Sequence, residues 1–226
     1  MVQSKVLGVN TADLDLNTLN QKFQHAHPRR ILTWCMHNIS GNLVQVSNFN
    51  IDDVVITDLI YRAINPEIKV PVVFVDSLHN FSETLELVTK ATIIYDLDLR
   101  VFRIRGINSR TDFAHKYGDK LWERDIELFQ QLTKIEPLEQ GLKQFEPVVQ
   151  ISGRCRSQGI GADYQLNPVF ELDEHKRLKI NPFASWSRVE SWAYVYEYDV
   201  VYNPLYDLGY GSVGDEPLTQ KSDCLC

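Results

Sequence analysis

The residues best suited to binding an anion are two arginines, Arg154 and Arg156, in a segment that runs from Gly153 to Gln158 as Gly-Arg-Cys-Arg-Ser-Gln. Guanidinium groups bind phosphate or sulfate oxygens through paired hydrogen bonds, so two of them after one strand could hold an anionic ligand. Without a ligand, the same arginines would form surface ion pairs that contribute little to stability. This segment is the strongest local basic patch in the chain.

A second candidate anion site is the turn formed by Ser47, Asn48, Phe49 and Asn50, between an apolar segment and a helix expected over residues 52–64. Backbone amides at a helix N-terminus attract anions. Asparagine tolerates a left-handed backbone better than most residues, which favours a tight turn at Asn50. A purely structural connection between strand and helix explains the same residues equally well.

Two further polar positions follow apolar or helical segments. Asp76, Ser77 and Leu78 end an apolar run over residues 70–77, where they form either a ligand-facing wall or a polar exit from a buried strand. Lys134 lies in an amphipathic stretch over residues 121–144, where it is either an anion contact or part of a solvated helix face.

The C-terminal segment over residues 202–220 combines a proline, several aromatic rings including Tyr210, and a Gly-Tyr-Gly-Ser-Val-Gly-Asp run. No regular helix or strand accommodates this pattern, so we expect a loop that closes over a ligand. Four cysteines (Cys35, Cys155, Cys224, Cys226) are too few and too scattered for a disulfide framework. Asp223 would raise the pKa of the adjacent Cys224 thiol.

Composition restricts the class of protein. The 226 residues are 44% hydrophobic, enough to bury one core, and 23 basic against 30 acidic residues give a net charge of −7. That charge argues against a nucleic-acid partner. We expect no membrane span and a cytoplasmic location, because no apolar run reaches about 18 residues. The six histidines show no zinc-site spacing, and no Gly-x-Ser-x-Gly elbow indicates a hydrolase.

The order of elements predicts an α/β fold with a parallel sheet. Helices broken at Pro28 precede apolar strands that alternate with helices, which is typical of right-handed crossover units with a ligand site at the carboxyl ends of the strands. We expect one domain over residues 1–226, with an N-terminal helical segment (1–40), an α/β core (41–200), and a closing loop with a tail (201–226). The expected strands are residues 43–49, 70–77, 100–105, 148–152 and 169–172, followed by a segment over residues 179–182. The expected helices are 52–64, 81–91, 110–117, 121–144 and 187–198.

Six blocks of sequence, in order, resemble the sulfonucleotide reductases, which reduce phosphoadenylyl sulfate or adenylyl sulfate to sulfite. The first two blocks contain Ser-Asn-Phe-Asn and Val-Phe-Val-Asp-Ser-Leu-His, and the last two contain the two arginines Arg154 and Arg156 and the run Asn-Pro-Phe-Ala-Ser-Trp. The six blocks are residues 47–60, 73–85, 116–125, 132–137, 152–159 and 180–195. The closing loop resembles that of the same family. The resemblance implies a parallel-sheet domain of the adenine nucleotide α-hydrolase-like fold.

The resemblance also implies roles for the candidate residues. Ser47, Asn48 and Phe49 would line the phosphate turn, where the family usually has glycine at the position of Asn50. Asp76, Ser77 and Leu78 would lie near the nucleoside; Lys134, Gly153, Arg154, Arg156 and Gln158 would hold the anionic groups; and Tyr210 would close the site. In the family, a cysteine in a Glu-Cys-Gly-(Leu/Ile)-His signature attacks sulfur, and thioredoxin or glutaredoxin then releases sulfite. That signature is absent, so the nucleophile would be Cys224, Cys226 or a cysteine beyond them.

Among family members, this chain resembles the branch without an iron–sulfur cluster. The cluster cysteines are replaced by Phe129-Gln130-Gln131 and by the run over residues 214–218. The resemblance implies phosphoadenylyl sulfate as substrate and a homodimer. Three alternatives stay open: reduction of adenylyl sulfate, which Glu216-Pro217 favours; nucleotide binding without catalysis; and an ATP pyrophosphatase, whose Ser-Gly-Gly-x-Asp-Ser loop is absent.

Overall fold

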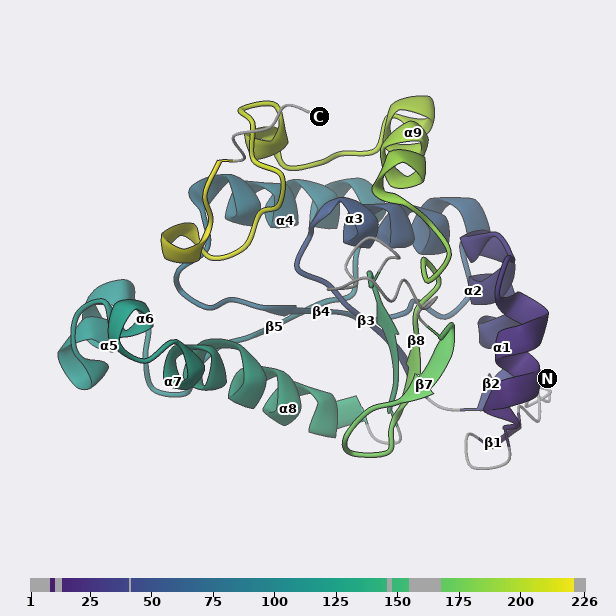
Figure 1. Ribbon diagram of the computed structural model, residues 1–226, viewed down its shortest axis with the longest axis horizontal. Coiled ribbons are helices and arrows are strands. Elements are labelled where there is room, and N and C mark those ends of the chain that lie inside the picture. Colours follow the sequence, from purple (N-terminus) through teal and green to yellow (C-terminus); the bar gives the residue numbers. More distant parts are fainter. Residues whose placement is uncertain (1–8, 11–13, 41, 146–147, 155–167, 222–226) are drawn as a thin grey trace, which may run out of the picture.

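The computed structural model describes residues 9–10, 14–40, 42–145, 148–154 and 168–221. Its centre is a six-stranded sheet with the strand order β5-β4-β3-β6-β8-β7, in which all neighbours are parallel except the antiparallel edge pair β7–β8 (Figure 1). The strands are β3 (Asn42–Val46), β4 (Val72–Val75), β5 (Leu99–Phe102), β6 (Val148–Ser152), β7 (Phe170–Leu172) and β8 (Leu178–Ile180). A separate parallel pair joins β1 (Val9–Asn10) to β2 (Ile39–Ser40).

Helices cover both faces of this sheet. α3 (Ile51–Asp58) and α4 (Ser82–Tyr95) lie on one face, with α9 (Arg188–Tyr198) beyond them, and α8 (Glu136–Leu142) lies on the other face (Figure 1). α1 (Leu16–Phe23) and α2 (Pro28–Asn38) pack at the β7 side. In the described part of the chain, no helix is long and apolar enough to cross a bilayer.

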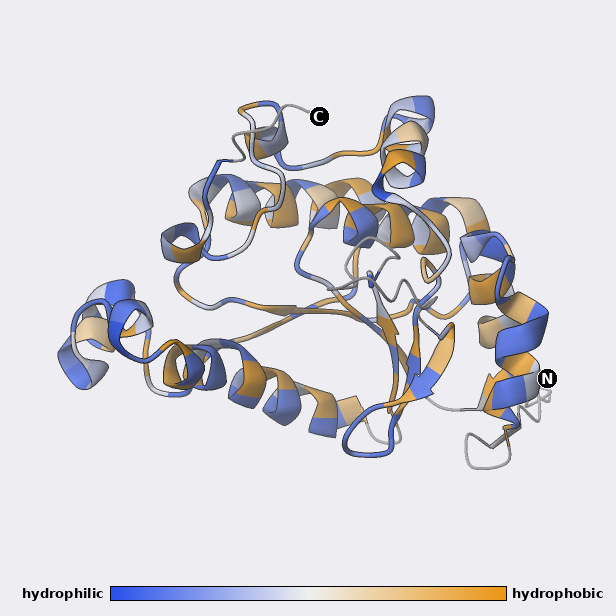
Figure 2. Cartoon of the chain, in the orientation of Figure 1, coloured by the Kyte–Doolittle hydropathy of each residue, from blue (hydrophilic) through white to orange (hydrophobic). Residues whose placement is uncertain are grey.

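Burial explains this layering. Val72, Val73 and Phe74 of β4 are almost completely buried, as expected for a central parallel strand covered on both faces. Every residue of α3 is buried, including the carboxylates of Asp52 and Asp58. Figure 2 shows hydrophobic residues concentrated on the strands and on the helix faces turned toward them.

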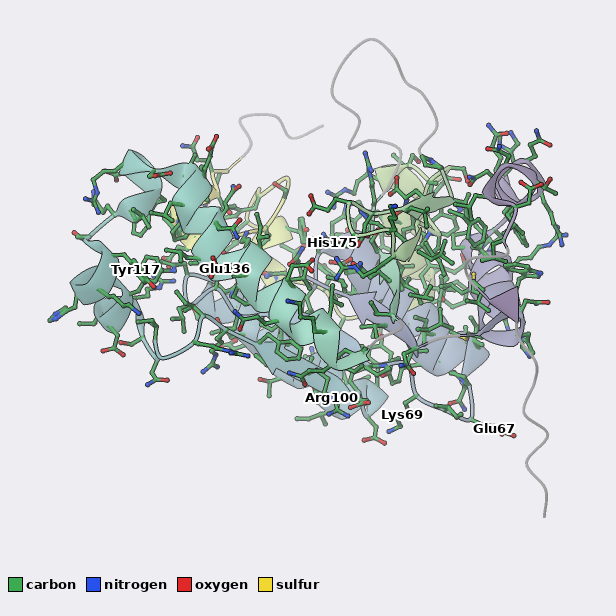
Figure 3. All side chains as sticks on the ribbon, turned by 90° about the horizontal axis from the view of Figure 1, so that it is seen from below. Glu67, Lys69, Arg100, Tyr117, Glu136 and His175 are labelled. Carbon is green, nitrogen blue, oxygen red and sulfur yellow. The ribbon has the colours of Figure 1, made fainter. Side chains whose placement is uncertain are left out.

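An ion-pair cluster fastens the β7–β8 hairpin to the layer of α8. Arg177 donates to both carboxylate oxygens of Glu139, at 2.9 and 2.7 Å, and to Asp173 at 2.6 Å. His175 lies beside Glu139, at 3.5 Å. Figure 3 views this layer from below, with Glu136 and His175 labelled. The turn of the hairpin is thereby held beside β6, which pairs with β8 at Gln150 and Ile151.

The predicted α/β fold with a parallel sheet is confirmed, as are the break before Pro28, the strand over residues 148–152 and the helix α5 (Arg110–Tyr117). The predicted continuous helix over residues 121–144 was wrong. It divides into α6 (Leu121–Arg124), α7 (Ile126–Gln130), a π-helical segment (Gln131–Ile135) and α8. Asp125 causes the first break, because its backbone leaves the helical region (φ −151°) and its side chain caps the next helix.

Other boundaries also differ from the expectation. The helix predicted to end near residue 91 continues to Tyr95, and the strand predicted to reach residue 105 ends at Phe102. The helix after β3 becomes π-helical over Leu59–Ile64 and ends at Asn65, whose left-handed backbone (φ 49°) stops it. These corrections move no element to another layer.

Candidate active site

The neighbouring strands β3 and β4 both end in a turn closed by a buried serine. Ser47 Oγ accepts a hydrogen bond from the amide of Phe49, and Ser77 Oγ accepts one from the amide of His79, each at 3.1 Å. Each turn contains a residue with a positive φ angle, Phe49 at 56° and Leu78 at 65°. Such angles are uncommon for residues other than glycine and persist where the surroundings fix the backbone.

The expectation of a left-handed backbone at Asn50 was wrong. Asn50 has a φ of −74° and is the N-cap of α3, where its side chain accepts a hydrogen bond from the amide of Asp53 at 3.1 Å. The left-handed residue is Phe49, whose buried ring packs edge-on against Phe74 with centroids 5.6 Å apart. Burial of the Phe49 ring offsets the cost of its left-handed backbone. Asn50, with its short amide side chain, is left to cap α3.

Three backbone amides at the Ser47 turn and the start of α3 already have partners inside the protein. The amide of Asn48 donates to Asp53 Oδ2 at 2.8 Å, that of Phe49 to Ser47 Oγ, and that of Asp53 to Asn50. An anion that used these amides would have to displace a side chain, above all the carboxylate of Asp53. Anion binding at this turn therefore stays a prediction.

Asp53 connects this turn to the end of β6. Its side chain is buried, and burial is the main cause that raises its pKa to about 7; the amide of Asn48 and the charge of Arg188 act in the opposite direction, while Asp52 adds to the increase. A methyl group added to Gly153 would lie 2.2 Å from Asp53 Oδ1. The two strand ends are thus in direct contact, with a carboxyl group between them.

The closing loop reaches the start of α3 through Tyr206, in a short turn (Pro204–Tyr206). Burial raises the pKa of its hydroxyl, while Arg188 and the backbone amide of Ile51 lower it. Beside it, Asp52 is fully buried and accepts a hydrogen bond from Ser191 Oγ of α9 at 2.6 Å. This loop therefore packs on α3 as well as on the β4 turn.

Asp76, at the end of β4, shapes the loop that follows it. One carboxylate oxygen accepts from the amide of Leu78 at 2.9 Å and from the Asn80 side chain at 3.2 Å, and the other lies 2.9 Å from Arg103 Nε. Its oxygens are used within the protein, so its place beside a nucleoside stays a prediction.

Ser77 and Lys134 meet at a third residue, Asp215 of the closing loop. Ser77 Oγ donates to Asp215 Oδ1 at 2.6 Å, and Lys134 Nζ lies 2.8 Å from Asp215 Oδ2. Lys134 projects from the π-helical segment, a geometry that often marks functional positions. Lys134 is therefore not part of a purely solvated helix face.

Backbone contacts join the closing loop to the β4 turn. Asn80 and Asp215 form an antiparallel bridge, and the amide of Glu216 donates to the carbonyl of His79 at 2.8 Å. Tyr210 packs edge-on against Phe81, with ring centroids 5.6 Å apart. The loop is closed over the end of β4 in this structure.

Arg110, from α5, clamps the same two segments. It donates to the backbone carbonyls of Leu78 at 2.8 Å and Asn80 at 2.9 Å, and its guanidinium lies 2.6 Å from Glu216. His79, in contrast, is turned away from solvent, with 2% exposure among Phe113 and other rings, and burial lowers its pKa. It is a core residue.

Gly153 and Arg154 lie at the end of β6, as expected. The Arg154 side chain is partly exposed and lies 3.5 Å from Glu171 of β7. Arg156 and Gln158 lie outside the described residues, so their approach to Arg154 stays a prediction. The same holds for Cys224 and Cys226.

Each of four cations around the strand ends has a carboxylate partner: the pairs are Arg103–Asp76, Arg110–Glu216, Lys134–Asp215 and Arg154–Glu171. An anionic ligand would therefore compete with these carboxylates or share their cations. Cys35 is buried far from solvent, and burial raises the pKa of its thiol. Over the ranges that the structure covers, no group of three or more His, Cys, Asp or Glu side chains is placed to hold a metal ion.

Sequence reasoning missed three functional candidates, Asp53, Arg110 and Asp215. Asp53 lies within the helix expected over residues 52–64, and no local pattern assigns it to a site. Asp215 stands at the end of the Gly-Tyr-Gly-Ser-Val-Gly-Asp run, the one signal that could have marked it. Arg110 has no local signal, because its role depends on two loops that are distant in sequence.

Comparison with known proteins identifies the family. The model of the phosphoadenosine phosphosulfate reductase domain matches residues 42–221. The chain is 36% identical over 214 residues to the phosphoadenosine phosphosulfate reductase of Emericella nidulans, which covers 92% of this chain and 69% of that protein. It belongs to the sulfonucleotide reductase family.

Other members of the sulfonucleotide reductase family match as well. An adenosine 5'-phosphosulfate reductase of Bacillus cereus is 32% identical, over 84% of this chain and 78% of that protein. The phosphoadenylyl-sulfate reductase of Candida auris, solved as a phosphate complex, superposes with a TM-score of 0.83 at 32% identity, over 94% of this chain and all of that one.

A more distant match confirms the predicted nucleotide-binding fold. The FMN adenylyltransferase of Candida glabrata superposes with a TM-score of 0.60 at 15% identity, over 93% of this chain and 66% of that protein. For this family member, the strand ends and the closing loop lie inside the matched residues, whereas Cys224 and Cys226 follow them.

Proposed function

We propose that this protein reduces phosphoadenylyl sulfate to sulfite and adenosine 3',5'-bisphosphate in sulfate assimilation. The observation that carries the proposal is the 36% identity to a phosphoadenosine phosphosulfate reductase over 92% of the chain. The matched family domain, residues 42–221, extends over both serine-closed strand ends and the loop that packs on the β4 turn.

In the proposed reaction, a cysteine thiolate attacks the sulfur of the substrate and the bond from sulfur to the phosphate oxygen breaks. The nucleotide leaves as adenosine 3',5'-bisphosphate, and the sulfonate stays on the cysteine. One thiolate of a dithiol donor such as thioredoxin or glutaredoxin then attacks the cysteine sulfur, which releases sulfite and leaves a mixed disulfide. The second thiol of the donor displaces the enzyme cysteine, and the donor becomes a disulfide. Two electrons pass from the dithiol to the sulfur, so no metal is needed to balance the reaction.

The site residues fit roles in binding rather than in bond breaking. Lys134 and Arg154 would attract the anionic groups, Ser77 and Leu78 would lie near the nucleoside, and Tyr210 would cover the ligand. Because the Lys134 and Arg154 side chains are partly exposed, salt screens their attraction for an anionic ligand, so we expect affinity to fall as salt concentration rises. Cys224 or Cys226 would be the attacking thiol.

The decisive experiment supplies sulfur-labelled phosphoadenylyl sulfate and reduced thioredoxin to the full chain and measures labelled sulfite. Adenylyl sulfate is tested in parallel, because relatives of Bacillus cereus carry the name of adenosine 5'-phosphosulfate reductase. Cys224→Ser and Cys226→Ser should each be compared with Cys35→Ser, since Cys35 is buried in the core. Sulfite production that neither C-terminal variant lowers would contradict the assigned thiols.

A second candidate is a nucleotide-binding relative without reductase activity. It is favoured by Cys35, because the one cysteine among the described residues is buried and offers no accessible thiol. Tight binding of adenosine 3',5'-bisphosphate without any sulfite would select this candidate.

We also propose a cytoplasmic homodimer of single-domain subunits that uses thioredoxin or glutaredoxin as its partner. Light scattering after size-exclusion chromatography tests the dimer, and replacing thioredoxin by glutaredoxin in the sulfite assay tests the donor.

A further inference from the structure

We propose that Asp215 is a positioning residue that fixes the ammonium group of Lys134 and docks the closing loop, so that closing the loop and placing the lysine are one event. The effect of Asp215 on ligand affinity rests on the proposed function. The contacts of Asp215 with Lys134 and with the β4 turn are independent of that function.

The burial of the two partners is unequal. The side chain of Asp215 is 1% exposed and that of Lys134 is 42% exposed, although the two groups are only 2.8 Å apart. A ligand can therefore reach the lysine but not the carboxylate. This is the arrangement expected when one residue contacts the ligand and the other orients it.

Asp215 also leaves part of its bonding capacity unused. Its Oδ1 accepts from Ser77 at 2.6 Å, while its fully buried Oδ2 has no well-aligned hydrogen bond and only the ionic contact with Lys134. A buried carboxylate without a partner is strongly destabilising, so Lys134 is needed to keep the loop docked.

The backbone of the closing loop is bonded to the β4 turn at Asp215 and at the residue after it. The bridge pairs Asp215 itself with Asn80, and the amide of the next residue, Glu216, donates to the carbonyl of His79. Ser77 bonds both Asp215 and the amide of His79. Loss of the charge at Asp215 should therefore loosen the loop and release Lys134 together.

The test uses Asp215→Asn, which keeps the shape and the bond to Ser77 but removes the charge. Asp207→Asn is the matched control, since Asp207 is an exposed carboxylate in the same loop. Two measurements need no substrate: hydrogen exchange at the amide of Glu216, and mass-spectrometric detection of amine modification at Lys134. Both rates should rise several-fold in Asp215→Asn and stay at the wild-type value in Asp207→Asn.

The third measurement is calorimetric affinity for adenosine 3',5'-bisphosphate, which we expect Asp215→Asn to weaken about tenfold or more, the effect of one charge-assisted contact. Asp215→Glu keeps a negative charge at this position and should retain part of the affinity that Asp215→Asn loses. In the double variant with Lys134→Met, the losses should not add, because both remove one interaction. Should Asp215→Asn unfold, the same exchange and affinity changes are expected of Lys134→Met.

The outcomes separate the two proposals. If the wild type neither binds the nucleotide nor yields sulfite, the proposed function fails while the exchange and modification results still decide the role of Asp215. Unchanged exchange and unchanged Lys134 reactivity in Asp215→Asn, or fully additive losses in the double variant, would overturn the inference.

Discussion

Gly153 lies so close to Asp53 that a methyl group at residue 153 would be 2.2 Å from the Asp53 carboxylate oxygen. Because Asp53 also accepts the amide of Asn48, this contact joins the ends of β3 and β6. We expect Gly153→Ala to lower the free energy of unfolding by about 1–3 kcal/mol through overpacking, measured by urea denaturation.

Gly214→Ala is the control for that substitution. A methyl group there would meet Thr219 Oγ1 at 3.5 Å, an ordinary contact, so the change should stay within about 0.5 kcal/mol. Equal effects of the two substitutions would show that the approach of Gly153 to Asp53 is not tight in solution.

The raised pKa of Asp53 predicts a dependence of stability on pH. The native carboxyl has a pKa of about 7 against an ordinary value of 3.8, so between these values the native state holds a proton that the unfolded chain has lost. The free energy of unfolding should therefore fall as pH rises from about 4 to 7, by about 1.4 kcal/mol for each unit of pKa difference that persists in solution. Asp53→Asn should flatten this slope in urea denaturation at several pH values.

Asp119→Asn should keep the wild-type slope, because Asp119 is exposed. The sign of the change in unfolding free energy with pH tests the prediction. A wild type whose stability increases over the same pH range, while Asp53→Asn behaves identically, would show that Asp53 ionises normally.

The parallel sheet could be predicted from the sequence because several of its strands are apolar runs bounded by polar residues, whereas the strand order and the antiparallel edge pair β7–β8 could not. Residues 148–152 are the clearest case, and β6 has these same bounds. The breaks within residues 121–144 could not be predicted. Asp125 leaves the helix without any proline or glycine, and the π-helical turn that carries Lys134 depends on packing rather than on local propensity.

The sequence could predict that site residues lie at the strand ends, but not which side chains they contact there. Ser47 and Ser77 follow apolar runs, so their place at one edge of the sheet could be inferred. The partner of Ser77 lies 138 residues away, at Asp215, and no periodic pattern encodes such a tertiary contact. Phe49 takes the left-handed backbone because its ring is buried against Phe74. The backbone preference of Asn50 gives no information about this tertiary contact.

Asp58 holds three helices together inside the core. Its carboxylate accepts from Tyr95 of α4 at 2.9 Å and from Tyr194 of α9 at 2.8 Å. Removing one donor to a buried charge should cost about 1–3 kcal/mol, so Tyr194→Phe should lower the urea midpoint clearly. Tyr196→Phe, at a side chain that is 70% exposed, should change stability by less than about 0.5 kcal/mol. Equal midpoints for both variants would refute this role of Asp58.

Arg110 should matter for ligand binding through its forked geometry rather than its charge. Its guanidinium donates to the carbonyls of Leu78 and Asn80, which a single ammonium cannot reproduce in the same arrangement. We expect Arg110→Ala to weaken affinity for adenosine 3',5'-bisphosphate about 10–100-fold, since small displacements of a binding loop have effects of this size. Arg110→Lys should recover little of it, whereas Arg100→Ala, which removes an exposed pair with Asp98, should bind like the wild type. Full recovery in Arg110→Lys would mean that charge alone holds the loop, and the clamp on the β4 turn would lose its support.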